Sequence, residues 1–314
     1  MAVYVNTNVS SLNGRRYLNN VQNQLTTTYQ RLSSGLRINS AKDDAAGLQI
    51  SSRLTTQING LNQGNRNASD GIAFAQTAEG AMDEMTGMLQ KIRTLAVQAS
   101  NGTNTLEDRK ALATEATALA QEITRIAKQT KFGGSLILDG AGANSIMTKG
   151  GGNAQGGGKD EIGKLTLQVG ANKGDTIAFE VHALKFSQIA SAGAVDKGNE
   201  LDKFWKAGTN NAPDSITFTK VENVQIAISA LDKMIGAVDA ARAGLGAIQN
   251  RLESSIRNQA NVSANQADAR SRIRDADFAE ESANLSQQSI IQQAASSMLM
   301  QANTRPQLGL SLLG

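Results

Sequence analysis

The chain has 314 residues, a net charge of +3 and 19% charged residues. With no long basic run, this weak and evenly spread charge argues against a nucleic-acid-binding protein. The absence of Cys and the single His, His182, argue against disulfide frameworks, thiolate chemistry and clusters of His ligands, so we expect no cofactor. Aromatic residues make up 4% and small residues are abundant, which suits long helices packed through small side chains better than one thick core.

No apolar run approaches the roughly 18 residues that a membrane-spanning helix needs, so we expect no membrane insertion. The N-terminal MAVYVNTNVS lacks both a basic and an apolar region, so we expect no cleavable Sec-type signal. The two prolines, Pro213 and Pro306, leave long stretches free of the strongest helix breaker.

The first segment carries apolar residues at helical spacing. They are Leu18, Val21, Leu25, Tyr29, Leu32 and Leu36. This stripe is narrow, so the helix needs a partner to be stable. Ser34-Gly35 predicts the end of the helix, because Gly readily takes the left-handed conformation.

A charge cluster, Lys42-Asp43-Asp44, follows. Ser40 stands three residues before Asp43, the spacing of a capping box, which predicts that the second helix begins near residue 41. Asp43 and Asp44 then fall in its first turn, where the helix dipole favours carboxylates. A catalytic carboxylate pair is the alternative, but neither a nucleophile nor a metal ligand lies nearby in the sequence, so capping explains the cluster better.

Residues 41–100 show a heptad pattern with small residues, typical of close helix packing. The two seams are Ala68, Ala75, Met82, Leu89 and Ala96, and Gly71, Ala78, Met85, Ile92 and Ala99. One helix over this range would be about 90 Å long. Met82, Met85 and Met88 could form an adaptable binding face, but the seam positions favour core packing. A third helix begins at Thr105, where Thr105 and Asp108 have capping-box spacing, and forms an antiparallel hairpin with the second.

The middle of the chain changes character. Residues 165–181 alternate apolar and polar around an Asn-Lys-Gly-Asp turn, which predicts a β-hairpin, and we expect His182 to end a strand. Residues 136–138 are a candidate third strand. The Gly-rich stretch 139–163 lacks the GxxxxGK[ST] order of a phosphate-binding loop, so we expect a surface loop.

Helical periodicity returns from about residue 217. One seam runs through Val224, Leu231, Val238, Leu245 and Leu252, the other through Ile228, Ile235, Arg242, Gln249 and Ile256. A terminal helix carries Ile291, Ala294, Ala295 and Met298. The predicted fold is mainly α: a long antiparallel helical rod or coiled coil formed by both chain ends, with a small β-hairpin region and a short variable insert mid-chain.

Several stretches resemble bacterial flagellins in the expected order. They are RLSSGLRINSAKDDAAG (31–47), ASDGIAFAQTAEGAM (68–82), LQKIRTLAVQASN (89–101), GLGAIQNRLESSI (244–256), ARSRIRDADFAEE (269–281) and SIIQQAASSMLMQAN with the final SLLG. Many motifs in order are far more specific than one short pattern. The similarity covers roughly residues 1–140 and 217–314.

The resemblance implies a subunit that polymerises into the flagellar filament, with the chain ends paired as an inner coiled coil. The implied domains are 1–42 and 273–314 for the inner layer, 43–140 and 217–272 for the outer layer, and 141–216 for the β-hairpin and a variable surface region. Because 182–216 is short, we expect a small outer appendage or none. The expected coiled-coil seams include Leu18, Val21, Leu25, Leu32, Met82, Met85, Leu89, Ile92, Ile228, Leu231, Ile235, Val238, Leu245, Leu252, Ile291 and Met298. The joint between the layers is expected at Gly35, Ser40, Asp43 and Asp44.

The resemblance also implies partners and a location. The partners are further copies of the chain, the flagellar export apparatus, a secretion chaperone at the C-terminal helix, the filament cap and the hook-junction proteins. The location is the extracellular flagellum, reached without a cleavable signal peptide. In this family a host Toll-like receptor binds a face that matches Gln90, Lys91, Arg93, Leu95 and Glu115, and the same residues could instead serve subunit packing. Lys91 stands where Arg is common and Thr94 where an acidic residue is common, which would weaken recognition, since Lys lacks the planar contacts of Arg.

Three alternatives stay open at this stage. A hook–filament junction protein has similar ends, but the close match at 31–47 favours the filament subunit. A chemoreceptor-like signalling hairpin would need a transmembrane segment or sensory domain. An enzyme is disfavoured because no convergent set of catalytic residues is visible.

Overall fold

The computed structural model describes residues 7–140, 144–149, 162–195, 200–206 and 214–311. It confirms the mainly α class. The helices are α1 (Val9–Ser34), α2 (Ala45–Ala99), α3 (Leu106–Gln129), α4 (Phe186–Ala192), the 3-10 turn η1 (Leu201–Lys203), α5 (Val221–Arg274) and α6 (Phe278–Ser311). The strands are β1 (Lys131–Phe132), β2 (Ser135–Leu136), β3 (Thr148–Lys149), β4 (Ile162–Gln168), β5 (Thr176–His182), β6 (Trp205–Lys206) and β7 (Ser215–Ile216).

The chain forms two compact units. Residues 1–59 and 262–314 make up the terminal unit, and residues 60–261 make up the central unit. The long helices α2 and α5 each contribute residues to both. The units differ in how they bury their apolar side chains.

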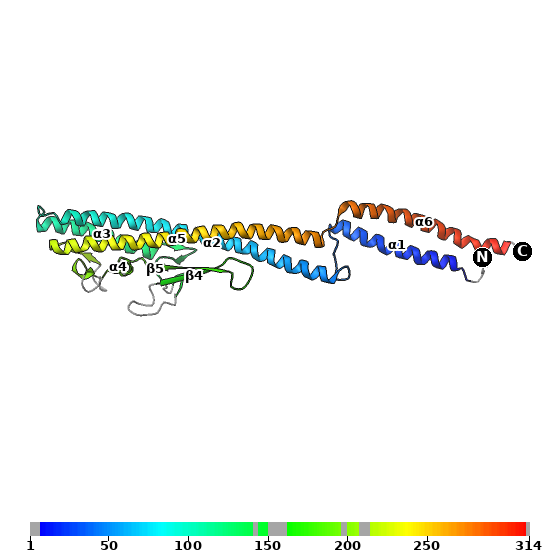
Figure 1. The fold of residues 1–314 in the computed structure, drawn as a ribbon, viewed down its shortest axis with the longest axis horizontal. Coiled ribbons are helices and arrows are strands. Elements are labelled where there is room, and N and C mark those ends of the chain that lie inside the picture. Colours follow the sequence, from blue (N-terminus) through cyan, green and yellow to red (C-terminus); the bar gives the residue numbers. More distant parts are fainter. Residues whose placement is uncertain (1–6, 141–143, 150–161, 196–199, 207–213, 312–314) are drawn as a thin grey trace. The chain divides into compact units, whose positions relative to one another are not determined.

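In the terminal unit, α1 and α6 lie side by side and antiparallel (Figure 1). Asn8 caps α1 by accepting from the Ser11 backbone N–H, and its side-chain amide donates to the Ala302 carbonyl at 2.7 Å. The predicted helix end is confirmed, since Gly35 closes α1 with a left-handed φ of 70° and donates to the Arg31 carbonyl.

The start of α2 differs from the prediction. The helix begins at Ala45, and Asp44, whose carboxylate accepts from the Gly47 backbone N–H at 2.9 Å, acts as its cap. Ser40 and Asp43 do bond to each other, but in a turn that precedes the helix. The sequence pattern detected a real carboxylate-centred turn and placed the helix start four residues too early.

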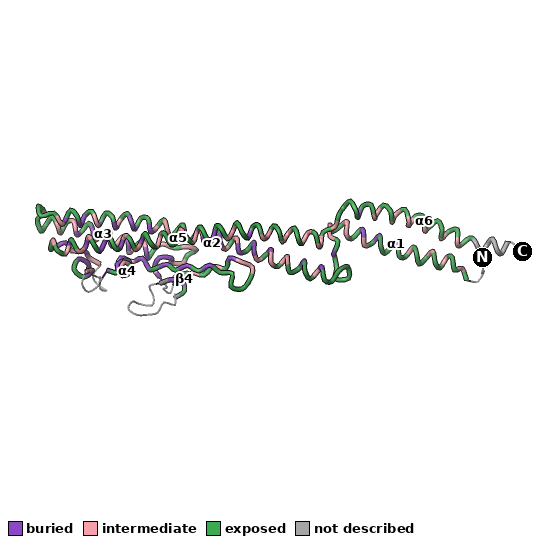
Figure 2. Tube along the Cα trace, in the orientation of Figure 1, coloured by how far each residue is buried: buried purple, intermediate pink, exposed green. Residues whose placement is uncertain are grey.

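The central unit has a continuous core built from α2, α3, α5 and the segments that cover them, coloured purple in Figure 2. Its fully buried side chains include Met82, Leu89, Ile92, Leu231 and Val238. The capping box that starts α3 is confirmed: the Thr105 hydroxyl accepts from the Asp108 N–H, and the Asp108 carboxylate accepts from the Thr105 N–H at 2.9 Å.

The predicted hairpin is confirmed as β4 and β5, which pair antiparallel from Ile162 opposite His182 to Gln168 opposite Thr176. The third strand is β3, within the stretch expected to be a loop, whereas Leu136 lies in β2 and pairs with Lys131 of β1 in a separate two-stranded sheet. The β1–β2 turn is possible because Gly133 and Gly134 both have positive φ. The rest of the Gly-rich stretch, at 141–143 and 150–161, lies outside the described residues.

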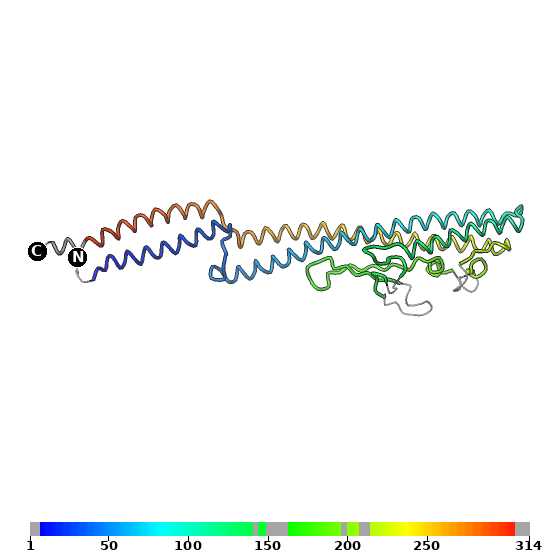
Figure 3. The backbone as a smooth tube through the Cα atoms, turned by 180° about the vertical axis from the view of Figure 1, so that it is seen from behind, coloured from blue at the N-terminus to red at the C-terminus, as the bar shows by residue number. Residues whose placement is uncertain are grey.

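The sequence predicts a small outer appendage or none for 182–216, and the described part of this stretch packs into the core. Phe186 of α4, Phe204, Trp205 of β6 and Ile216 of β7 are all buried in the core of the central unit. Figure 3, which views the molecule from the side opposite to Figure 1, shows the described part of this segment lying along the long helices. The segment uses several of the few aromatic residues of the chain, and burying each one contributes to stability.

Candidate interaction surface

The terminal helices expose an unusual number of large apolar side chains. Tyr17 is 65% exposed and Met298 is 68% exposed. Among the described side chains of α1 and α6, the other exposed large apolar residues are Val9, Leu12, Tyr29, Phe278, Ile290 and Met300. Clustered apolar residues in contact with water mark interaction surfaces, because each Å² later buried contributes about 25 cal/mol.

Helix α6 has apolar residues on more than one side. Ile290 and Ile291 are consecutive, and so are Met298, Leu299 and Met300. Consecutive residues of a helix point about 100° apart, so these side chains cannot all face α1. A helix that is apolar around its circumference is typical of a buried position, whereas α6 in the single chain contacts mainly α1.

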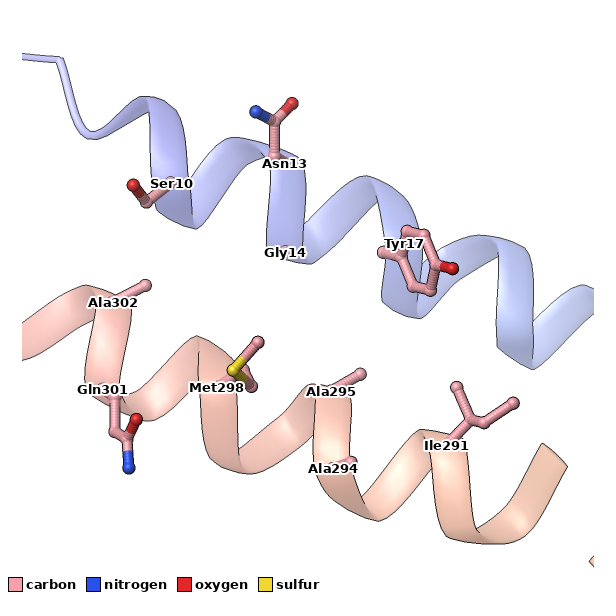
Figure 4. A pocket seen from close by; sticks show the side chains of 10 residues that line it. All are labelled: Ser10, Asn13, Gly14, Tyr17, Ile291, Ala294, Ala295, Met298, Gln301 and Ala302. Atoms are coloured by element: carbon pink, nitrogen blue, oxygen red, sulfur yellow. The ribbon is translucent and has the colours of Figure 1, made fainter. Parts of the chain in front are cut away.

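A groove of about 670 Å³ runs between α1 and α6 (Figure 4). It is lined by Ser10, Asn13, Gly14, Tyr17, Ile291, Ala294, Ala295, Met298, Gln301 and Ala302. The groove exists because Gly14 and the three alanines are small. Met298, expected in the seam, is exposed and lines this groove instead. Leu299 makes the helix contact, since a Cβ added at Gly14 would lie 3.1 Å from its Cδ1 atom.

A polar layer lies beside the groove. The Thr28 hydroxyl donates to the side-chain oxygen of Gln288 at 3.2 Å, and Arg31 pairs with Glu281 at 3.0 Å. Thr28 and Glu281 are buried. Polar pairs inside a helix seam cost stability compared with apolar ones and fix the register of the two helices.

Two helix breaks of the terminal unit face each other. The Gly35 carbonyl accepts from the Ala276 N–H at 3.0 Å, and the Arg37 N–H donates to the Arg274 carbonyl at 2.7 Å. Asp277 caps α6 by accepting from the Ala279 N–H at 2.8 Å. The predicted joint residue Gly35 therefore lies opposite the break between α5 and α6.

Both carboxylates of the Lys42-Asp43-Asp44 cluster accept hydrogen bonds from neighbouring residues. Asp43 accepts from the Ser40 N–H at 2.8 Å, the Ser40 hydroxyl at 3.0 Å and the Asn39 N–H at 3.1 Å. These bonds, the one from the Ser40 backbone foremost, hold the pKa of Asp43 below its ordinary value of 3.8. Among the described residues no group of His, Asp and Glu is arranged to hold a metal ion.

The residues expected to bind a receptor or a neighbouring subunit are mostly on the surface and engaged in ion pairs. Lys91 pairs with Glu115 of α3 at 3.0 Å, and Arg93 pairs with Asp232 of α5 at 2.5 Å. The Asp232 carboxylate raises the pKa of the Arg93 guanidinium through this hydrogen bond. Gln90 is exposed. Leu95 differs, because it is 7% exposed and packs in the core, so its side chain is not available on the surface.

The expected seam residues divide by unit. In the central unit, Met82, Met85, Leu89, Ile92, Leu231, Val238, Leu245 and Leu252 are buried, while Ile228 and Ile235 are half-buried. In the terminal unit only Val21 and Leu25 of the expected residues are buried, while Leu18, Leu32 and Ile291 are half-buried.

Two features escaped the sequence analysis. One is the contact of the β4–β5 hairpin with α2 at Gly60, Gly64 and Gly71, of which Gly71 was expected only in a helix seam. A Cβ at Gly60 would lie 2.8 Å from the Ala171 Cβ. Glycines four and seven residues apart inside a helical pattern were the available indication. The other feature is the Asp277 cap, which the acidic residues Glu280 and Glu281 just after it could have revealed.

Comparison with known proteins decides the family. The model of the bacterial flagellin N-terminal helical region matches residues 5–143, and the model of the C-terminal helical region matches residues 228–313. Flagellin A of Vibrio anguillarum is 40% identical over 378 aligned positions, and polar flagellin C of Vibrio parahaemolyticus is 39% identical over 383, each covering both chains completely. The chain belongs to the bacterial flagellin family.

As a flagellin, the chain is a structural subunit of the extracellular flagellar filament. A solved Vibrio parahaemolyticus protein, described as flagellar hook-associated, shares the fold with a TM-score of 0.56 and 16% identity, covering 74% of this chain and 100% of that one. The family match gives the hook–filament junction alternative less support than the filament subunit. Within the described helices we find no stretch of the length and apolarity needed to cross a membrane.

Proposed function

We propose that the terminal unit is the part of this flagellin that completes its fold only in the filament. The observation that carries the proposal is the exposure of large apolar side chains on α1 and α6, on more than one side of the helix pair. Neighbouring copies would cover these side chains through heterologous contacts, which do not close on themselves and so produce an open helical polymer.

The layer boundaries follow from this assignment. Residues 1–42 and 273–314 would form the inner layer, residues 43–140 and 217–272 the outer one, and residues 141–216 the region beyond it. The paired breaks at Gly35 and Ala276, with Ser40, Asp43 and Asp44 in the following turn, would form the joint between the layers. In the free subunit we expect residues 1–40 and 275–314 to be poorly ordered and to fold on assembly, as in coupled folding and binding.

The finer partner assignments are part of the same proposal. Export without a cleavable signal peptide would deliver the subunit to the growing filament, with a secretion chaperone covering the C-terminal helix on the way. The filament cap and the hook-junction proteins would contact the subunits at the two ends. Neither an enzymatic activity nor a nucleic acid, a membrane or a cofactor is part of the proposed role.

A host Toll-like receptor would bind the free subunit at Gln90, Lys91, Arg93 and Glu115. Two of these side chains bridge α2 to its neighbours, so a receptor must compete with the Lys91–Glu115 and Arg93–Asp232 pairs. Exposed ion pairs contribute little stability, so a receptor can break these two pairs at a small cost in free energy. Lys91→Arg is expected to strengthen receptor binding, measured by titration of the monomer, and unchanged binding would contradict this assignment.

Polymerisation of the purified protein tests the main proposal. We expect long helical filaments from this single protein in electron micrographs. Assemblies that stop growing after a few copies would contradict the proposal and favour the junction protein.

A matched pair of variants locates the assembly surface. Leu12 of α1 is 55% exposed and Leu106 of α3 is 52% exposed, so the same substitution at each removes the same side chain at nearly the same exposure. Because burying a Leu is worth about 1.5–3 kcal/mol, Leu12→Asn should raise the critical concentration at least about tenfold. Leu106→Asn should leave it nearly unchanged, and equal effects would contradict the assignment to the terminal unit.

A further inference from the structure

The methionines of the chain fall into two groups. Met82, Met85 and Met234 are 0% exposed, Met147 is 4% exposed, and Met88 is half-buried. Met298 and Met300 are 68% and 64% exposed, and both belong to α6. Among the described methionines, the highly exposed thioethers therefore lie within one turn of one helix.

The side chains of Met298 and Met300 project from different sides of α6. Met298 lines the groove toward α1, beside Ala295 and Ala294 (Figure 4). Met300 lies two residues further, which places it about 200° around the helix axis from Met298. A chemical change at this pair would alter both the groove and the opposite side of α6.

We propose that Met298 and Met300 form an oxidation site that controls whether the free subunit can assemble; this rests on the proposed role of α6 in the filament. The co-reactant is hydrogen peroxide. A sulfur lone pair attacks one peroxide oxygen and the O–O bond breaks. The proton of the attacked oxygen moves to the departing hydroxide, which leaves as water. The thioether is oxidised by two electrons to a sulfoxide, and the peroxide is reduced.

The product no longer suits an apolar contact. A sulfoxide is polar and chiral, and it disrupts surfaces that bury methionine. Neighbouring copies would have to bury this polar group without a prepared hydrogen-bond partner, which costs free energy. Assembly in turn would cover the same sulfur atoms, so the reaction is confined to subunits that have not yet been incorporated.

Graded hydrogen peroxide treatment of the monomer, followed by peptide mapping, tests the site. We expect Met298 and Met300 to oxidise at least about tenfold faster than Met82, Met85 and Met234, since oxidation follows exposure. In filaments the difference should largely disappear. Equal rates for all five residues in the monomer would overturn the assignment of the site.

Seeded polymerisation, followed by sedimentation, tests the consequence. Treated wild-type protein should lose assembly several-fold and regain it after incubation with methionine sulfoxide reductases A and B. The double variant Met298→Leu/Met300→Leu should assemble before and after treatment, because Leu keeps an apolar side chain of similar volume. The control variant Met88→Leu should remain as sensitive as the wild type.

The outcomes separate this inference from the proposed function. Untreated wild-type protein that forms no filaments would contradict the proposed function, and peptide mapping would still decide the oxidation site. Untreated and oxidised proteins that assemble equally well would overturn the inference alone. Equal loss of assembly by the oxidised wild type and the double variant would also overturn it.

Discussion

The central and terminal units both contain long helices with apolar residues at helical spacing, yet the units differ in how far they bury these residues. In the central unit, Leu89, Ile92 and Leu231 are fully buried within the chain itself. In the terminal unit, Leu12, Tyr17 and Ile290 face outward. The difference teaches that a heptad-like pattern indicates where a helix seeks a partner, and does not say whether the partner is in the same chain.

The number of covering elements explains the difference. Helices α2 and α5 are covered in the central unit by α3, the β4–β5 hairpin and the segment with α4. Within the described part of the chain, α1 and α6 pack mainly against each other. Two helices can bury one seam, and any apolar residue outside that seam stays exposed until another chain arrives.

The largest expected effect separates the two units directly. Leu89→Ala should lower the free energy of unfolding by about 2–5 kcal/mol, because it leaves a cavity in a closed core. Leu12→Ala should change the unfolding of the free chain by less than about 0.5 kcal/mol, because Leu12 is exposed. Urea unfolding of both variants measures this, and similar losses would contradict the distinction between the units.

The next effect concerns the joint. Gly35→Pro removes the hydrogen bond to Arg31 and forbids the φ of 70°, so the end of α1 should be disrupted at a cost of about 3 kcal/mol. We expect impaired assembly or altered filament shape in electron micrographs, with the unfolding of the central unit unchanged.

Gly35→Asn is the matched control for the joint, because Asn tolerates the left-handed conformation. It should support nearly normal filaments. Normal swimming of cells whose only flagellin carries Gly35→Pro would show that the joint assignment is wrong.

A smaller effect is expected where the hairpin sits on α2. The Val169 carbonyl lies so close to Gly64 that a methyl group there would force the hairpin away. We therefore expect Gly64→Ala to lower the free energy of unfolding by about 1–3 kcal/mol. Gly80 lies in the same helix with nothing within 4 Å of an added Cβ. Gly80→Ala should therefore raise the free energy of unfolding by up to about 1 kcal/mol. If thermal unfolding shows that both variants change stability in the same direction, the close-packing argument is wrong.

The smallest effect is the pH dependence of the turn before α2. Because hydrogen bonds hold the pKa of Asp43 below its ordinary value of 3.8, the turn is stabilised above that pH and loses this stabilisation as the pH falls through the lowered pKa. The amide resonances of Asn39 and Ser40 should shift together on acidification. In the Asp43→Asn variant they should not titrate, and an unchanged titration there would rule out this carboxylate as the cause.

Much of the central unit could be predicted from the sequence because its contacts are local or periodic. The Thr105 capping box and the β4–β5 hairpin each depend on residues close together in the chain. The packing of Phe186 and Trp205 against the core could not be predicted, since it depends on contacts between segments with no period.

The terminal unit was harder to predict for a different reason. The sequence places Met298 at a seam position, but with one partner helix only part of the apolar surface of α6 can be covered, and Leu299 takes the covered position. The start of α2 was misplaced because Asp43 and Asp44 both have capping chemistry, and local spacing alone does not choose between them.

Hydrogen exchange measured by mass spectrometry on free and polymerised subunits tests the central claim most directly. We predict fast exchange in α1 and α6 of the free subunit and strong protection of both helices in the filament. The parts of α2 and α5 that belong to the central unit should be protected in both states. Equal protection of α1, α6 and the central part of α2 in the free subunit would contradict the claim that the terminal unit is completed only by its neighbours.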